Sequence, residues 1–302
     1  MLSFYSHGKL LITGEYLVLD SALALAVPTK LGQSLRITPL DSSTLVWKSE
    51  LHDGSLWFET EISLPIKHHI TSDDPVIQKL YEILIAAQSL NPDFLQATQG
   101  YEVISFLEFP RNWGLGSSST LIANIAQWAT INPYELLEKT FGGSGYDIAC
   151  ATTKNPITYT RHATTPIVDA VIFDPAFKEN LFFIHLNRKQ NSRDSITHYR
   201  NLEISERETH IKTFTSLTKE IIASQDSLSR FEHLVMEHES QLSKIIQTPT
   251  IKNQLFNDYP KAIKSLGGWG GDFVLATGTK EDMTYFKERG YATIIPYLEM
   301  VL

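Results

Sequence analysis

A run of glycine and serine joins two apolar segments that have different periods. Residues 110–120 read Pro-Arg-Asn-Trp-Gly-Leu-Gly-Ser-Ser-Ser-Thr. The apolar residues before them, at 101–109, predict a strand, and those after them, at 121–129, predict a buried helix. Gly114 and Gly116 let the backbone approach an anion, and hydroxyls stand where the first helical N–H groups lack partners. The segment is either a phosphate-binding loop or a serine-capped helix that follows a turn.

Composition limits the classes of protein to which the chain can belong. Its 302 residues, 42% hydrophobic and 20% charged, predict about two globular domains. A net charge of −8 argues against a nucleic-acid or membrane partner. Cys150 is the only cysteine, which excludes an intrachain disulfide, and it is expected to be a buried, unreactive side chain. Charged residues interrupt the first apolar stretch, so we expect no secretory signal and a cytoplasmic protein.

Short apolar runs in the first hundred residues predict strands at 10–12, 16–19, 22–27, 34–38, 44–48 and 56–62. The period changes after Asp73-Asp74-Pro75, which predicts the start of a helix. Further helices are predicted at 133–140, 206–224, 228–246 and 251–263, with one more that ends at Gly290. Further strands are predicted at 157–160, 168–173, 181–186, 273–277 and 291–296. We place a domain boundary near residue 176, which gives domains of residues 1–176 and 177–302.

Three more glycine-bearing segments accompany the loop. Residues 6–16 read Ser-His-Gly-Lys-Leu-Leu-Ile-Thr-Gly-Glu-Tyr, residues 143–147 read Gly-Ser-Gly-Tyr-Asp, and residues 264–271 read Lys-Ser-Leu-Gly-Gly-Trp-Gly-Gly. In this order they resemble the motifs of the GHMP small-molecule kinases, the superfamily of galactokinase, homoserine kinase, mevalonate kinase and phosphomevalonate kinase. The resemblance spans nearly the whole chain.

The resemblance implies an α+β fold of two domains. The first would be similar to the second domain of a small-subunit ribosomal protein, and the second to a ferredoxin-like sandwich. The segment 143–147 is similar to that of mevalonate and phosphomevalonate kinases, whereas Gly-Glu-Tyr at 14–16 is more similar to phosphomevalonate kinases, because mevalonate kinases more often carry His after the Glu. The run Gly-Tyr-Asp-Ile-Ala also resembles a compact bacterial branch. Diphosphomevalonate decarboxylases, which lack the Gly-Glu-Tyr turn, are less similar.

ATP and Mg²⁺ are the cofactors that the resemblance implies. The residues expected to hold the nucleotide phosphates are Asn112, Gly114, Leu115, Gly116, Ser117, Ser118 and Ser119. Ser118 would also be a ligand of Mg²⁺, which prefers oxygen. The stretch from Ser118 to Asp147 is shorter than in animal mevalonate kinases, so spacing does not identify the acidic ligand. Glu135 and Glu138 are the candidates.

Two residues are predicted to be catalytic. Asp147 would accept or orient the proton of the attacking hydroxyl, and Lys9 would stabilise the transferring phosphoryl group. On residue type alone, Asp147 could instead be a turn-forming or helix-capping carboxylate, and Lys9 could be an exposed lysine at the end of a strand.

The acceptor is expected to be a small molecule that carries a hydroxyl and a carboxylate or phosphate. Gly145, Lys189, Ser192 and Arg193 are the predicted binding residues, because an arginine fork suits a carboxylate or phosphate. Arg188 and Arg111 are further anion-binding candidates. The alternatives are a solvated basic loop and, for Ser192, an N-cap of a helix.

Several conspicuous residues are assigned no chemistry. Glu15 is predicted to anchor backbone amides in a turn, and His68-His69 and Glu237-His238-Glu239 are predicted to be surface residues rather than metal ligands. Two other functions stay open: a kinase for homoserine or a sugar, and a noncatalytic nucleotide-binding protein with the same scaffold. The oligomeric state is also open, and a homodimer is one alternative.

Overall fold

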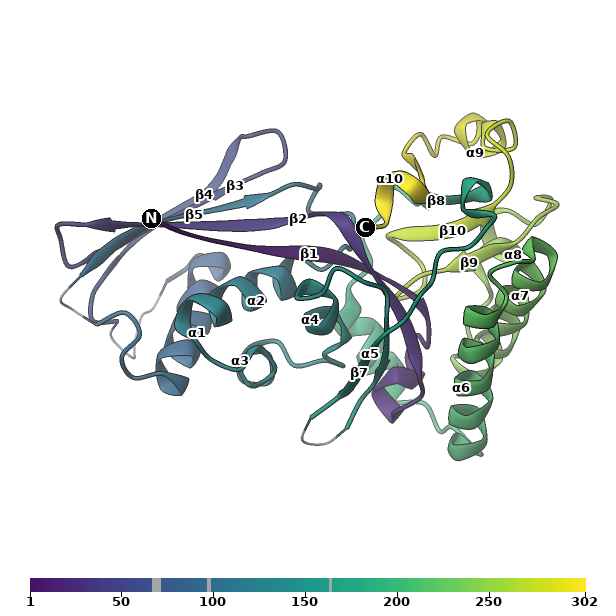
Figure 1. The fold of residues 1–302 in the computed structure, drawn as a ribbon, viewed down its shortest axis with the longest axis horizontal. Coiled ribbons are helices and arrows are strands. Elements are labelled where there is room, and N and C mark those ends of the chain that lie inside the picture. The colour runs from purple at the N-terminus through teal and green to yellow at the C-terminus, as the bar shows by residue number, and fades with distance from the viewer. Residues whose placement is uncertain (67–71, 97–98, 163–164) are drawn as a thin grey trace. The chain divides into compact units, whose positions relative to one another are not determined.

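The computed structural model describes residues 1–66, 72–96, 99–162 and 165–302, a mixture of helices and strands (Figure 1). Contacts within the chain separate two compact units. Unit 1 comprises residues 1–8, 31–111 and 115–152, and unit 2 comprises residues 9–30, 112–114 and 153–302. Two long strands, β1 (Leu2–Thr13) and β2 (Ala24–Leu40), belong partly to each unit. The boundary near residue 176 stays a prediction.

A sheet and four helices make up most of unit 1. The strands follow the order β4 (Leu56–Ser63), β3 (Thr44–Glu50), β5 (Gly100–Leu107) and the C-terminal part of β2. The β3 and β5 pair is parallel, whereas β3–β4 and β2–β5 are antiparallel. The helices α1 (Pro75–Leu90), α2 (Ser117–Ala129), α3 (Pro133–Thr140) and α4 (Tyr146–Ala151) cover one face of the sheet (Figure 1).

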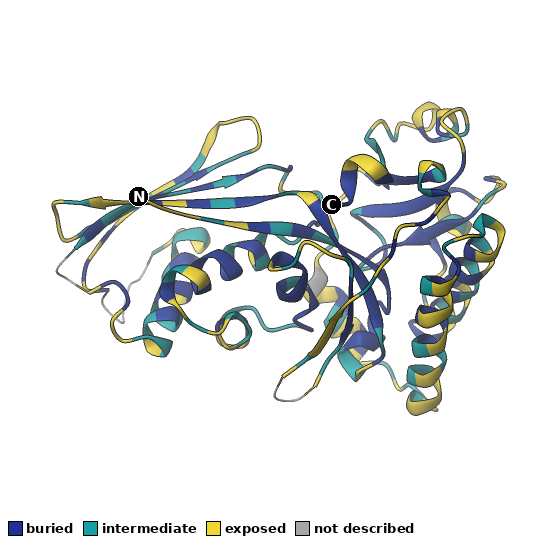
Figure 2. Ribbon diagram, viewed as in Figure 1, coloured by how far each residue is buried: buried dark blue, intermediate teal, exposed yellow. Residues whose placement is uncertain are grey.

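The core of unit 1 follows from alternation along its strands. In β3, Leu45 and Trp47 are buried while the residues between them are partly exposed, as expected for a half-buried strand. These side chains pack against the apolar faces of α1, α2 and α3, which are the dark faces of those helices in Figure 2. The side chain of Asp74 accepts the Val76 N–H at 2.8 Å, which confirms the predicted start of α1.

Unit 2 contains a four-stranded antiparallel sheet in the order β11 (Ile294–Pro296), β8 (Leu181–His185), β10 (Phe273–Thr277) and β9 (Ile263–Ser265). A separate antiparallel pair, β6 (Ile157–Thr160) and β7 (Ile167–Ala170), joins the N-terminal part of β2. The helices are α5 (Ser192–Arg200), α6 (Arg207–Ala223), α7 (Leu228–Ile245), α8 (Ile251–Leu255), α9 (Thr284–Glu288) and α10 (Tyr297–Met300), with the 3₁₀ turns η1 (Leu17–Asp20) and η2 (Lys178–Asn180).

Three predicted elements are wrong. Residues 16–19 are not a strand, because Tyr16 has φ +63° and leads into the 3₁₀ turn η1. The helix predicted over 251–263 ends at Leu255, before Pro260. Ile263, the last residue of the predicted range, is instead the first residue of β9. The separate runs at 22–27 and 34–38 are parts of one strand, β2.

Among the described residues, none of the helices combines the length and the apolar character that a membrane span requires.

Candidate functional site

The predicted phosphate loop leads into a helix that no side chain caps. The N-cap of α2 is Gly116, in the left-handed conformation at φ +88°, and it has no side chain that could accept a hydrogen bond from the first turn. The interpretation of this segment as a serine-capped helix is therefore wrong. Ser118 in the first turn is exposed. A helix that begins in this way presents N–H groups and the positive end of its dipole to an outside anion.

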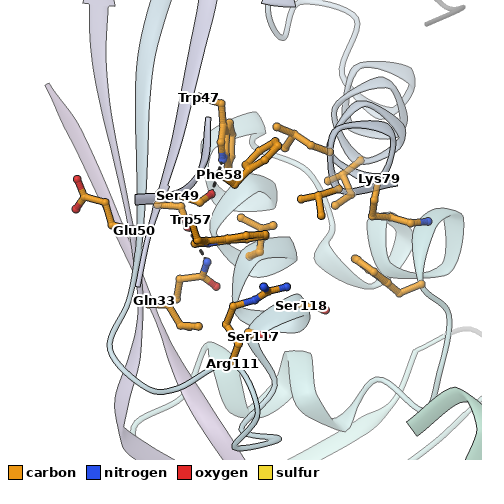
Figure 3. A pocket seen from close by; sticks show the side chains of 17 residues that line it. Gln33, Trp47, Ser49, Glu50, Trp57, Phe58, Lys79, Arg111, Ser117 and Ser118 are labelled. Atoms are coloured by element: carbon orange, nitrogen blue, oxygen red, sulfur yellow. Dashed lines mark hydrogen bonds between the residues drawn. The ribbon is translucent and has the colours of Figure 1, made fainter. Parts of the chain in front are cut away.

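A pocket of about 210 Å³ lies beside this helix start, within unit 1 (Figure 3). Its lining is largely apolar and aromatic and includes Trp57, Phe58 and Phe141, with Ser117 and Ser118 at the α2 end. The residues that complete it are Gln33, Trp47, Ser49, Glu50, Val76, Lys79, Leu80, Ile83, Ser105, Leu107, Arg111 and Leu121. Such a mixture of flat apolar walls and a few polar groups is typical of small-molecule sites.

Gln33 in the pocket wall is held by two side-chain hydrogen bonds. Gln33 donates to the Ser105 hydroxyl at 2.7 Å and accepts from the Thr120 hydroxyl at 2.6 Å. The guanidinium of Arg111 lies 3.8 Å from the centre of the Trp57 ring, near Ser118 in Figure 3. The pocket therefore offers an aromatic wall and a cation, next to a helix start that can bind an anion.

Asp147 lies in the first turn of α4, and α4 packs against α2. The helix begins at Gly145, which is buried at φ +89° and leaves room for this sharp entry. The Asp147 side chain is half-buried. Asp147, the predicted base, therefore lies on a helix of unit 1 that neighbours α2, the helix predicted to bind phosphate.

The middle of the phosphate loop, residues 112–114, is held within unit 2. The Lys9 ammonium donates to the Gly114 carbonyl at 3.1 Å, and His185 Nε2 donates to the Asn112 carbonyl at 3.1 Å. The ring of Trp113 meets Phe273 edge-on, with 5.4 Å between ring centroids. The structure thus brings Lys9 to the loop, and it adds His185, which carried no recognisable signal in the sequence.

Asp272 is a second residue in this region to which the sequence analysis gave no role. It follows the third glycine-rich motif directly, and its carboxylate accepts the Gln190 N–H at 3.1 Å. Burial raises the pKa of the Asp272 carboxyl, while the Gln190 N–H and the charges of Lys9, His185 and Lys189 oppose that rise. We call these groups the Asp272 cluster, which consists of Lys9, Gly114, His185, Lys189, Gln190 and Asp272.

The other predicted residues have simpler surroundings. Lys189 and Arg193 are exposed, and Glu135 and Glu138 are exposed on α3, where Glu135 accepts a 3.4 Å hydrogen bond from its N-cap, Asn132. In the described part of the chain, neither Glu135 nor Glu138 forms a hydrogen bond with Ser118. The prediction that Ser192 caps a helix is wrong, because the side chain of its neighbour Asn191 caps α5.

Four charged or titratable residues are buried together in unit 2. Glu15, His238, Glu239 and Lys264, which we call the buried cluster, are at most 1% exposed. The prediction that His238 and Glu239 are surface residues is wrong, because both side chains are buried, His238 beside Glu15 and Glu239 beside Lys264 of β9. Glu15 pairs with the ammonium of Lys264 rather than serving only to anchor backbone amides. His68 and His69 lie outside the described residues.

Proton placement in the buried cluster follows from its charges. Two carboxylates share one ammonium, and Glu239 lies 3.6 Å from Lys264 while it accepts from the Ser265 hydroxyl at 2.9 Å. Burial raises the pKa of Glu15 despite Lys264, and it raises the pKa of Glu239 to about 7. Burial lowers the pKa of His238 well below its ordinary value, and its Nε2 accepts the Gly14 N–H at 3.2 Å. The imidazole is therefore neutral, with its proton on Nδ1.

Cys150 is buried, as predicted. In the described ranges, no group of three or more His, Cys, Asp or Glu side chains is arranged to hold a metal ion. Surface exposure, the reason given for rejecting Glu237-His238-Glu239 as a metal site, does not hold for His238 and Glu239.

The fold can be compared with proteins of known structure. No family model matches the sequence, and no curated protein is similar enough in sequence to match. Among solved structures, a protein of Listeria innocua has a TM-score of 0.74 at 17% identity, over 97% of this chain and 96% of that one. The mevalonate kinase of Methanococcus jannaschii has a TM-score of 0.71 at 15% identity, over 97% and 96% of the two chains.

A third neighbour was solved with both ligands of a kinase reaction. It is the phosphomevalonate kinase of Streptococcus pneumoniae in complex with phosphomevalonate and AMPPNP, with a TM-score of 0.68 at 15% identity over 96% of each chain. The neighbours agree with the predicted α+β architecture and span nearly the whole chain. The chain therefore has the fold of the GHMP small-molecule kinases, as its glycine-bearing motifs predicted.

Proposed function

We propose that this chain is an ATP- and Mg²⁺-dependent kinase that phosphorylates a small hydroxy acid. Mevalonate or phosphomevalonate, in isoprenoid precursor synthesis, is the acceptor we favour. The observation that carries the proposal is the uncapped start of α2 beside an aromatic pocket of about 210 Å³. This pairing offers a binding place for phosphate next to one for a flat heterocycle, and both groups are present in a nucleotide. The shared fold supports it.

The nucleotide would be held mainly by unit 1. Its base would stack on the aromatic wall that contains Trp57, and its phosphates would accept N–H groups from the first turn of α2. Asn112 and Gly114, in the middle of the loop, would complete the phosphate-binding site. Arg111 would stabilise the negative charge close to the pocket.

Mg²⁺ fits the residues present. It takes oxygen ligands, keeps several waters and is usually bound through one or two protein groups and substrate phosphates. The exposed Ser118 hydroxyl at the start of α2 is such a group. When bound, the ion would neutralise charge on the phosphates. The acidic group that completes its coordination, Glu135, Glu138 or another residue, stays open.

The acceptor would be activated by the predicted catalytic residues and held by the predicted acceptor-binding residues. Asp147 would accept the proton of the attacking hydroxyl, and Lys9 would stabilise the charge of the transferring phosphoryl group. The exposed Lys189 and Arg193 would bind the carboxylate or phosphate of the acceptor. Gly145, at the start of α4, would let that acceptor approach the backbone.

A panel of acceptors, assayed for ADP release, tests this function. We expect transfer to mevalonate or phosphomevalonate, and Asp147→Asn to lower kcat by about 100-fold while ATP affinity stays within several-fold. Asp93→Asn, which changes an exposed carboxylate of unit 1, is the matched control and should retain full activity. Near-normal turnover of Asp147→Asn would refute its role as the base.

The same panel separates the other functions. Homoserine and galactose belong in it, because a galactokinase solved with galactose shares the fold at 12% identity and a TM-score of 0.71. Carbon dioxide release would indicate a decarboxylase instead. Binding of Mg-ATP without transfer to any acceptor would favour a noncatalytic nucleotide-binding protein.

A further inference from the structure

Asp272 has an unusual, left-handed backbone conformation. Its φ is +53°, in the left-handed region that few residues other than glycine adopt, although aspartate tolerates it better than most. Two backbone hydrogen bonds of 2.8 Å hold it there, from its own N–H to the Arg188 carbonyl and from the Leu186 N–H to its carbonyl. Such strain persists where the surroundings fix it, and it clusters at functional sites.

The carboxylate of Asp272 lies against Gly114 of the phosphate loop. One oxygen accepts the Gln190 N–H at 3.1 Å. A Cβ placed on Gly114 would lie 2.2 Å from the other oxygen and 2.2 Å from the carboxyl carbon, far inside van der Waals contact. Gly114 is therefore required for two reasons: its φ of +65° and the carboxylate that occupies the space of a side chain.

Gly114 has a second partner, Lys9, whose ammonium donates to the Gly114 carbonyl at 3.1 Å. The charge of Lys9 also acts on the Asp272 carboxyl, as do those of His185 and Lys189. In a trans peptide the carbonyl and the following N–H point in opposite directions. A Gly114 carbonyl fixed on Lys9 therefore turns the Leu115 N–H away from Lys9.

We propose that Asp272 is a positioning residue for phosphoryl transfer, which holds the Gly114 peptide and the Lys9 ammonium in their working orientation. Its carboxylate supports the loop at Gly114, while its negative charge keeps the ammonium of Lys9 beside the Gly114 carbonyl. Lys9 can then act on the phosphoryl group without first losing entropy to orientation. This inference rests on the proposed function and adds one residue to its machinery.

The first experiment separates charge from backbone shape. Asparagine also tolerates the left-handed conformation and can still accept the Gln190 N–H, so Asp272→Asn removes little except the charge. We expect kcat to fall by about 10- to 100-fold, with the KM for ATP within about threefold and the melting temperature within about 2 °C. Asp258→Asn, at an exposed ion pair with Arg289, is the control and should be fully active. Unchanged kcat in Asp272→Asn would overturn the positioning role.

The second experiment measures the contact without any activity assay. Gly114→Ala should lower the melting temperature through both the clash with Asp272 and the strained φ. In an Asp272→Gly background only the strained φ remains, so the same substitution should cost at least about 3 °C less. Equal losses in both backgrounds would refute the contact. A wild-type protein that binds nucleotide but transfers no phosphate would refute the proposed function and the catalytic role of Asp272, whereas the melting experiment would still decide the contact.

Discussion

The buried cluster and the Asp272 cluster both place a lysine near a carboxylate beside a glycine-bearing motif, yet they differ in their access to water. Lys264 and its partners are at most 1% exposed, whereas Lys9 and Asp272 are half-buried and Lys189 is exposed. A charge that is removed from water must be compensated within the protein, so it belongs to the fold. A charge that still meets solvent can exchange partners with a ligand. We infer that the first lysine stabilises the protein and the second acts on substrate.

Lys264→Met gives the largest expected effect. It leaves Glu15 and Glu239 buried without their counter-charge, and breaking such a pair costs about 3–5 kcal/mol. Urea unfolding should show this loss in the free energy of unfolding. Lys261→Met is the matched control three residues away, because its ion pair with Asp282 is about one-third exposed and should contribute less than about 1 kcal/mol.

If Lys264→Met does not fold, the double variant Lys264→Met with Glu15→Gln keeps the comparison testable. It removes one charge of each sign, so we expect a folded protein that is more stable than the single variant. Equal losses from Lys264→Met and Lys261→Met would show that burial does not distinguish the two lysines, which would break the comparison.

Lys9→Met should have the opposite profile. We expect kcat to fall by about 10²–10³-fold, the size found when one preorganised donor to a transition state is removed. The free energy of unfolding should change by less than in Lys264→Met, because the Lys9 side chain is only partly buried whereas Lys264 is fully buried. Steady-state kinetics and urea unfolding on the same preparation check both statements. A loss of stability as large as that of Lys264→Met, with turnover retained, would exchange the roles of the two clusters.

The pH dependence of stability sharpens the contrast further. The pKa of Glu239 is raised to about 7, compared with 4.5 for an ordinary glutamate. Its contribution to stability is therefore fully present below about pH 4.5 and is lost as pH rises through about 7, a change of about 3 kcal/mol. Glu15, whose pKa burial also raises, acts in the same direction.

Urea unfolding at pH 5 and pH 8 measures this change. His238, whose pKa is lowered, has the opposite dependence, since its contribution is lost as pH falls. The informative quantity is therefore the difference between wild type and Glu239→Gln, which keeps His238. We expect the variant to lose less stability than wild type between the two values. Parallel curves would show that Glu239 does not carry the buried proton.

Features that depend on residues close together in the sequence could be predicted from it, whereas features that depend on distant partners could not. The bounds of α3 and β10 were predicted without error, because an Asn-Pro start and an apolar run are local signals. The Gly/Ser loop and Asp147 were singled out through spaced motifs, and their roles stay predictions. Glu237-His238-Glu239 was misassigned to the surface, because its charge partner Lys264 is 25 residues beyond Glu239 and is recognised only when β9 packs against α7.

Asp272 shows a second kind of limit. The sequence places it next to a glycine-rich motif, but its importance comes from Gly114, which lies far away in the chain. The left-handed backbone of Asp272 carries no signal either, because aspartate is common in ordinary turns. Contacts of this kind need the folded backbone, whereas the glycine at 114 was predictable from the loop alone.

Ser265→Ala gives the smallest expected effect and tests how completely the buried cluster is satisfied. The Ser265 hydroxyl donates to Glu239 at 2.9 Å, and its loss leaves that carboxylate with fewer hydrogen bonds in a site without water access. We expect a loss of about 1–2 kcal/mol at pH 8, where Glu239 is ionised, and a smaller loss at pH 5, where it is protonated. Urea unfolding at both values checks this. A hydrogen bond to Glu239 is stronger when the carboxylate is ionised, so its contribution to stability should change with pH. An equal loss of stability at pH 5 and pH 8 would therefore mean that the Ser265 hydroxyl stabilises β9 by packing alone.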